Sequence, residues 1–195
     1  MLWDLFLFVC WWQYTGQFRD RQVNQYFDNL WGQQQKVWTP TIYFITKQKK
    51  EKLLVQSAKS IIENNKVKSD KLLEYSFSEN YINESANILE LYTKTDTYFP
   101  EVSIIVKDTV DNSPVYLSIN SYSSENPKDT IPARKQDYIR KTTKIEREYL
   151  ETVFDQNNSE TRYTSSDGNY ELFYPYIKNN KKIVLYFSDY QRYGK

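Results

Sequence analysis

The spacing of hydrophobic and polar positions changes at Pro100. Before that residue, hydrophobic side chains recur mostly every three to five positions among polar ones, which is typical of amphipathic helices. After it, short apolar or alternating runs are bounded by turn residues, which is typical of strands. The pattern therefore predicts an α+β chain with a helical N-terminal part and a sheet in its C-terminal part.

Four helical stretches are expected in the N-terminal part of the chain. The first two cover residues 17–36 and 41–64. A third, short helix is expected to begin at Ser69 or Asp70, because either side chain can cap a helix. The fourth covers residues 81–93. The apolar stripe of the second stretch consists of Leu54, Ala58, Ile61 and Ile62.

The first twelve residues are apolar except for Asp4. They lack the basic start and the small-residue cleavage site of a signal peptide, and they fall short of the roughly 20 apolar residues that span a membrane. Two interpretations stay open. Residues 1–14 are the end of a membrane helix, with Trp11, Trp12 and Tyr14 as its interfacial aromatics, or they form a short buried element. The adjacent tryptophans favour the membrane-helix stub.

Strand signals dominate after Pro100, interrupted by one helical stretch. The expected strands cover residues 102–106, 115–119, 160–164, 169–177 and 182–190. Turn residues separate neighbouring strands at Asp111-Asn112, Asp167-Gly168 and Asn179-Asn180. A loop over 121–133 and a helix over 135–154 are expected between the second and third strands.

Alternation along the fourth strand assigns its side chains to two faces of the sheet. One face receives Tyr170, Leu172, Tyr174 and Tyr176, and the other receives Glu171, Phe173 and Pro175. We expect one face to pack on the helical lead-in and the other to form a pocket.

Composition excludes several kinds of chemistry. The sequence has no His, which removes the commonest general base and metal ligand. It has one Cys, too few for a disulfide or a cysteine zinc cluster, and four scattered Gly, which form no phosphate loop. A net charge of +1 with interspersed acidic residues argues against a nucleic-acid partner. We therefore expect no enzyme activity, no metal and no cofactor.

Tyrosines are the candidate binding residues in a chain with 18 of them. A tyrosine-lined pocket offers apolar walls with hydroxyls that orient a small polar or aromatic ligand. Arg134 and Arg140 can anchor a carboxylate through a bidentate pair. The alternative is that these tyrosines are ordinary strand residues and the arginines are solvated. The expected ligand-binding residues are Tyr116, Arg134, Tyr138, Arg140, Tyr163, Tyr174 and Tyr186.

The order of elements resembles a PAS-like core: two strands, a crossover helix and three strands. With the long helical lead-in, the chain resembles the extracytoplasmic Cache sensor domains. Local similarities are the segments ELFYPYI at 171–177 and KKIVLYF at 181–187. The resemblance implies a helical lead-in over 15–97 and a five-stranded antiparallel sheet with a crossover helix over 98–195. The amino-acid-binding Cache group has a signature that includes Trp, and no Trp follows residue 38, so that group's ligand is not carried over.

The resemblance also implies a function. The chain is expected to be the small-molecule-sensing domain of a bacterial transmembrane receptor, located in the periplasm or at the cell surface. Its N-terminal helix would transmit ligand binding to the membrane, and a homodimer is compatible with this arrangement. The alternative is a secreted or surface-attached binding protein, also without enzyme activity, that recognises carbohydrate or a protein partner through exposed aromatics such as Trp31 and Trp38.

Overall fold

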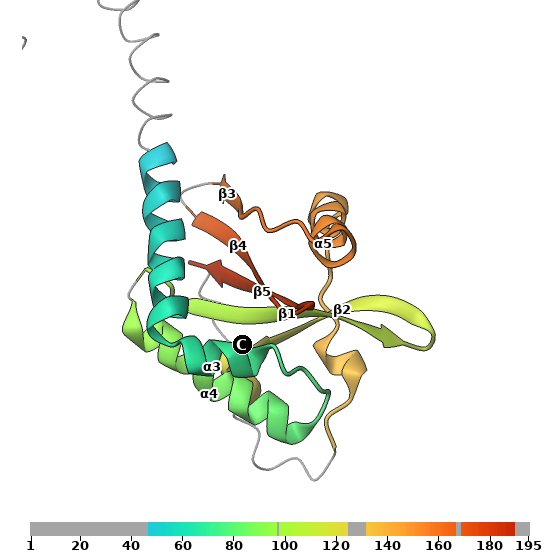
Figure 1. Ribbon diagram of the computed structural model, residues 1–195. Helices are drawn as coiled ribbons and strands as arrows, with labels where there is room; N and C mark the ends of the chain where they lie inside the picture. The colour runs from blue at the N-terminus through green and yellow to red at the C-terminus, as the bar shows by residue number, and fades with distance from the viewer. Residues whose placement is uncertain (1–46, 97, 125–131, 167–168, 190–195) are drawn as a thin grey trace, which may run out of the picture. The chain divides into compact units, whose positions relative to one another are not determined.

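A computed structural model of the protein describes residues 47–96, 98–124, 132–166 and 169–189 (Figure 1). The chain divides into two units, residues 1–50 and 51–195, and the packing contacts below are described within the second. The expected membrane-helix stub, the 17–36 helix, Trp31, Trp38 and the Asp167-Gly168 turn lie outside the described residues. In the part of the chain that is described, no helix is both long and apolar enough to cross a membrane.

Three helices precede the sheet among the described residues. Residues 47–64 are helical, and α3 (Lys66–Leu72) and α4 (Glu79–Thr95) follow. The predicted apolar stripe of the first is buried: Leu54, Ala58, Ile61 and Ile62. The Ser78 hydroxyl caps α4 by accepting a hydrogen bond from the amide of Tyr81.

The predicted start of the third helix was wrong. Ser69 and Asp70 lie inside α3 and do not cap it. The Ser69 hydroxyl is buried, where it donates to the Ile62 carbonyl and lies 2.6 Å from the Tyr92 hydroxyl. The Asp70 carboxylate accepts a hydrogen bond from the Tyr176 hydroxyl. Both side chains therefore serve tertiary contacts, which local sequence does not reveal.

A five-stranded antiparallel sheet follows the helices, in the order β2-β1-β5-β4-β3. Its strands are β1 (Glu101–Val110), β2 (Ser113–Asn120), β3 (Arg162–Ser166), β4 (Asn169–Lys178) and β5 (Lys181–Ser188). Positive φ angles at Asp111, Asn112, Asn179 and Asn180 form the two tight turns that the sequence predicts. The predicted α+β fold, with helices before an antiparallel sheet, is confirmed.

Each face of the sheet has its own hydrophobic core. The 47–64 helix, α3 and α4 pack against one face, which includes Leu172 and Leu185. The other face, with Phe173 and Val184, packs against α5 (Lys144–Gln156) (Figure 1). The alternation predicted for β4 is therefore observed, with Leu172 on the helical lead-in and Phe173 on the opposite side.

The predicted continuous helix over 135–154 was wrong. Two 3-10 helices, η1 (Ser121–Ser124) and η2 (Lys135–Tyr138), precede an extended segment, and α5 begins only at Lys144. Ile139 lies opposite Leu117 in an antiparallel bridge. The Thr143 hydroxyl then caps α5 by accepting a hydrogen bond from the amide of Glu146. The helix therefore begins at Lys144, after the bridge to β2 and the Thr143 cap, although the helical spacing of the sequence begins at Tyr138.

Asp108 joins three parts of the fold. Its carboxylate accepts hydrogen bonds from Tyr75, which follows α3, and from Lys135 of η2 at 2.8 Å. Burial by itself raises the pKa of this carboxyl, but the hydrogen bonds from Lys135 and Tyr75 outweigh it, so the pKa lies below its ordinary value. The charged form of Asp108 therefore stabilises the folded state.

We expect Asp108→Asn to lower the free energy of unfolding by about 1–2 kcal/mol at pH 7, because Lys135 and Tyr75 would then donate to a neutral amide and no longer to a charged carboxylate. A lowered folded-state pKa means that this stabilisation is present above the unfolded pKa of about 3.9 and is lost as the pH falls through the folded value. Urea unfolding of the parent and the variant at several pH values measures the difference, which should narrow in acid. Equal stability at pH 7, or a difference that widens in acid, contradicts this role.

Candidate functional site

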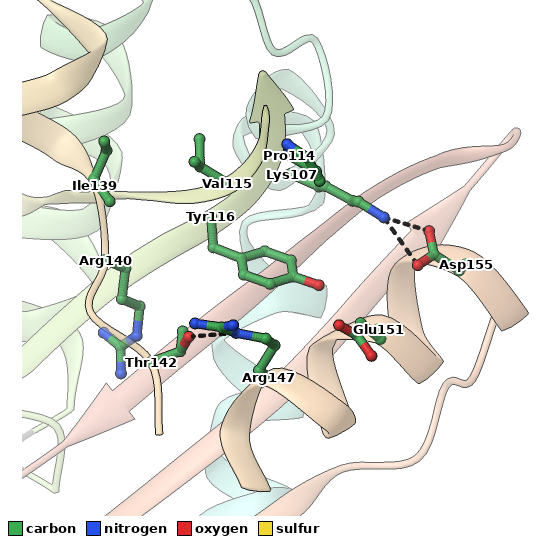
Figure 2. Close-up of a pocket in the computed structure, with 10 residues that line it drawn as sticks. All are labelled: Lys107, Pro114, Val115, Tyr116, Ile139, Arg140, Thr142, Arg147, Glu151 and Asp155. Carbon is green, nitrogen blue, oxygen red and sulfur yellow. Dashed lines mark hydrogen bonds and ion pairs between the residues drawn. The ribbon is translucent and has the colours of Figure 1, made fainter. Parts of the chain in front are cut away.

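A cavity of about 460 Å³ lies between the β1–β2 hairpin, the extended segment before α5 and α5 itself (Figure 2). It is lined by Lys107, Pro114, Val115, Tyr116, Ile139, Arg140, Thr142, Arg147, Glu151 and Asp155. The cavity lies beside the point where Ile139 and Arg140 pair with β2, before α5 begins at Lys144. An aromatic ring and several charged groups meet in this cavity.

Tyr116 on β2 provides the aromatic wall of the cavity. Its side chain is buried, and its ring packs against Phe154 of α5 with 5.7 Å between the ring centroids. Figure 2 shows its hydroxyl directed toward Glu151 and Asp155. Burial and the charges of these two carboxylates raise the pKa of Tyr116 to about 12. The tyrosine is therefore neutral at physiological pH and presents a hydroxyl beside an apolar ring.

An ion pair between the sheet and the helix lines one end of the cavity. Lys107 of β1 donates to both carboxylate oxygens of Asp155, at 2.6 and 2.9 Å, in the last turn of α5. The two charges neutralise each other, so this end adds little net charge to the cavity. Because the pair is largely exposed, its contribution to stability is small.

Arg140 lies where the cavity meets the sheet. Its Nε donates to Glu146 Oε1 at 2.6 Å, and both side chains are nearly buried, at 13% and 11% exposed. The guanidinium carbon is 4.1 Å from the centroid of the Tyr186 ring, which is a cation–π contact. Burial alone lowers the pKa of Arg140, but the hydrogen bond and charge of Glu146 raise it above its ordinary value. Arg140 is therefore a fixed cation that already has a carboxylate partner.

Tyr186 continues this contact network across the sheet. Its hydroxyl donates to Glu171 Oε1 at 2.8 Å, and burial followed by the charge of Glu171 raises the pKa of Tyr186 to about 12. Glu171 also accepts a hydrogen bond from Thr164 of β3 at 3.2 Å. The wall of the cavity is thus linked through side chains to the edge strand of the sheet.

Arg147 and Glu151 are the two charged groups of the cavity that form no ion pair with a described residue. Arg147 donates a hydrogen bond from Nε to Thr142 Oγ1 at 3.4 Å, which turns its side chain toward the start of α5. In Figure 2, Glu151 lies near the hydroxyl end of Tyr116 and Arg147 lies toward the Cβ end of that side chain. The cavity therefore offers one cation and one carboxylate to a ligand, with an aromatic ring beside both.

The structure brings some of the predicted binding residues together and separates others. Tyr116 and Arg140 line the cavity, and Tyr186 lies beneath Arg140. Tyr138, Tyr163 and Tyr174 instead pack against the core under the N-terminal helices. Arg134 is mostly exposed and forms an ion pair with Asp137.

Sequence reasoning did not single out Lys107, Arg147, Glu151 or Asp155 as binding residues. One signal was present. Arg147, Glu151 and Asp155 are spaced four residues apart, so they follow one line along a helix. Whether that line of residues faces the sheet or the solvent depends on where α5 begins and on how it packs. The local sequence pattern predicts neither.

Comparison of the chain with known protein families, curated proteins and solved structures finds no match. Within the described ranges, no group of three or more carboxylate or Cys side chains is placed to hold a metal ion. The chemistry of the site therefore has to be inferred from its own geometry. An aromatic wall, a fixed Arg140 and two further charges that face the cavity are features of a binding site for a small polar molecule.

Removing Glu146 should leave the Arg140 cation nearly buried without its partner. We expect Glu146→Ala to lower the free energy of unfolding by about 3 kcal/mol. The double variant Arg140→Met, Glu146→Ala should recover part of that loss, because no uncompensated charge remains. Chemical denaturation of the parent, Glu146→Ala and the double variant measures the free energy of unfolding of each.

The matched control for this prediction is Glu148→Ala, which removes a 61% exposed carboxylate from the same helix. It should change stability by less than about 0.5 kcal/mol. The Arg140–Glu146 pair does not stabilise this region if Glu146→Ala changes the free energy of unfolding as little as the control does. The same conclusion follows if the double variant is less stable than Glu146→Ala.

Proposed function

We propose that the chain is a small-molecule-sensing domain of a bacterial membrane receptor, without enzyme activity, extracytoplasmic and related in layout to the PAS-like Cache domains. The observation that carries this proposal is the cavity between the sheet and the crossover segment. The strand order β2-β1-β5-β4-β3 supports it, since a hairpin, a crossover and a three-stranded meander are what the PAS-like layout implies. The proposal that the domain belongs to a membrane receptor is based on the apolar run at residues 1–12.

The size and lining of the cavity suit a small ligand. A volume of about 460 Å³ lies within the range of roughly 300–1,000 Å³ typical of small-molecule sites. Tyr116, Val115 and Ile139 offer apolar contact, while Arg147 and Glu151 offer charge. This combination of an apolar wall with a few polar groups is what orients a ligand and gives specificity.

Strand β2 is the element through which binding would reach the N-terminal helices. Tyr116 faces the cavity, while its neighbour Leu117 is buried in the core that the helices share with the sheet. A ligand that favours one position of β2 changes the packing of Leu117 against that core. The mechanism is a population shift between two packings of the helices on the sheet, transmitted toward the N-terminus.

Filling the cavity tests the proposal. A panel of small carboxylates, amines, sugars and aromatic compounds is screened against the full chain by thermal shift. We expect at least one compound to raise Tm, since a ligand at 100 times its Kd adds about 2.7 kcal/mol. The increase should be lost in Ile139→Trp, because Ile139 lines the cavity and its side chain is exposed enough, at 40%, to be enlarged without disrupting the core.

Ile145→Trp is the matched control. Ile145 is an isoleucine of the same region that is 66% exposed and does not line the cavity. It should retain the full Tm increase. The proposal fails if no compound raises Tm, or if Ile139→Trp responds to the compound as strongly as Ile145→Trp does.

A further inference from the structure

Two exposed residues of opposite charge on α5, Arg147 and Glu151, form no ion pair with each other, although helix geometry would let them meet. Arg147 and Glu151 are four residues apart, a spacing that commonly allows an ion pair on a helix. On the same helix, Lys144 and Glu148 have this spacing and form such a pair at 3.9 Å. Arg147 instead binds Thr142, and Glu151 lies beside Tyr116, where its charge contributes to the raised pKa of that tyrosine. Both groups line the cavity.

The other charges of the cavity are already neutralised. Lys107 is paired with Asp155, and Arg140 is paired with Glu146. A purely anionic ligand would contact Arg147 but bring a like charge near Glu151. A purely cationic ligand would contact Glu151 but bring a like charge near Arg147. A neutral ligand would cover both charges without pairing either, which costs free energy when they are desolvated. The complementary ligand carries one charge of each sign.

The separation of the two groups limits the ligand further. Four residues span about 6 Å along a helix axis, and the Tyr116 ring faces the two side chains from β2. An α-amino acid carries its ammonium group on the carbon next to its carboxylate, so it is too short to pair with both groups at once. A ligand with several methylene groups between its charges spans the distance and lays its apolar chain on the tyrosine ring.

We propose that the cavity binds a small ω-amino acid, with its carboxylate on Arg147, its ammonium group on Glu151 and its carbon chain against Tyr116. This inference rests on the proposed sensing function and specifies its ligand class. Arg147 has guanidinium donors besides the Nε that binds Thr142, so a carboxylate can be held without breaking that contact.

The test is calorimetric titration of the full chain with 5-aminopentanoate and three comparison compounds. Pentanoate and pentylamine each carry one of the two charges, and alanine carries both at the wrong spacing. We expect 5-aminopentanoate to bind at least about tenfold more tightly than any of the three. Arg147→Gln and Glu151→Gln should each weaken its binding by about tenfold or more, because each removes one charge pair while keeping the side chain similar in size.

The control is the double variant Lys144→Gln, Glu148→Gln, which removes the paired charges outside the cavity and should bind 5-aminopentanoate like the parent. If pentanoate or pentylamine binds as tightly, or if both single variants keep full affinity, the ω-amino acid assignment is wrong. If 5-aminopentanoate does not bind while a screened compound still loses its effect in Ile139→Trp, the assignment fails and the sensing function stands. If no compound of either panel binds, both fail.

Discussion

The contact between the Arg140 guanidinium and the Tyr186 ring, completed by Glu146, fixes the crossover segment against the sheet. The cavity depends on this contact. The amide of Arg140 also donates to the Tyr116 carbonyl at 2.8 Å, so Ile139 and Arg140 pair with β2 and form a wall of the cavity. Because the segment is extended, α5 begins only at Lys144, which places its line of charged residues opposite Tyr116. A buried, hydrogen-bonded cation thus sets the shape of the site before any ligand binds.

The fold was predictable where its signals are local. Alternation marked the strands, and Asn179-Asn180 marked a turn because asparagine tolerates the positive φ angles that such a turn requires. Prediction failed where a long-range contact decided the local structure. The helical spacing from Tyr138 to Val153 is genuine, yet Ile139 pairs with Leu117, 22 positions earlier, and Ile145 is exposed. Likewise, the sequence around Ser69 is typical of a helix cap, but the Ser69 hydroxyl forms a buried hydrogen bond with the Tyr92 hydroxyl.

The site was predictable only in part, for a related reason. Alternation shows that Phe173 and Tyr174 lie on opposite faces, but it does not show which face the N-terminal helices cover. Tyr174 was therefore grouped with Tyr116, although the structure places it under the helices. Arg140 was identified as a candidate cation, but its pairing with Glu146 depends on where α5 starts. Arg147 and Glu151 became visible as a pair only once that start was known.

Hydrogen exchange at the Arg140 amide tests most directly whether the crossover segment forms a fixed wall. This amide lies in a segment without regular secondary structure, and its only described hydrogen-bond acceptor is the Tyr116 carbonyl. The account predicts that, in the full chain at neutral pH, it exchanges as slowly as the β2 amides that pair with β1, because its hydrogen bond opens only when the segment leaves the sheet. Exchange as fast as that of a freely exposed amide would show that the wall, and the cavity it encloses, does not persist in solution.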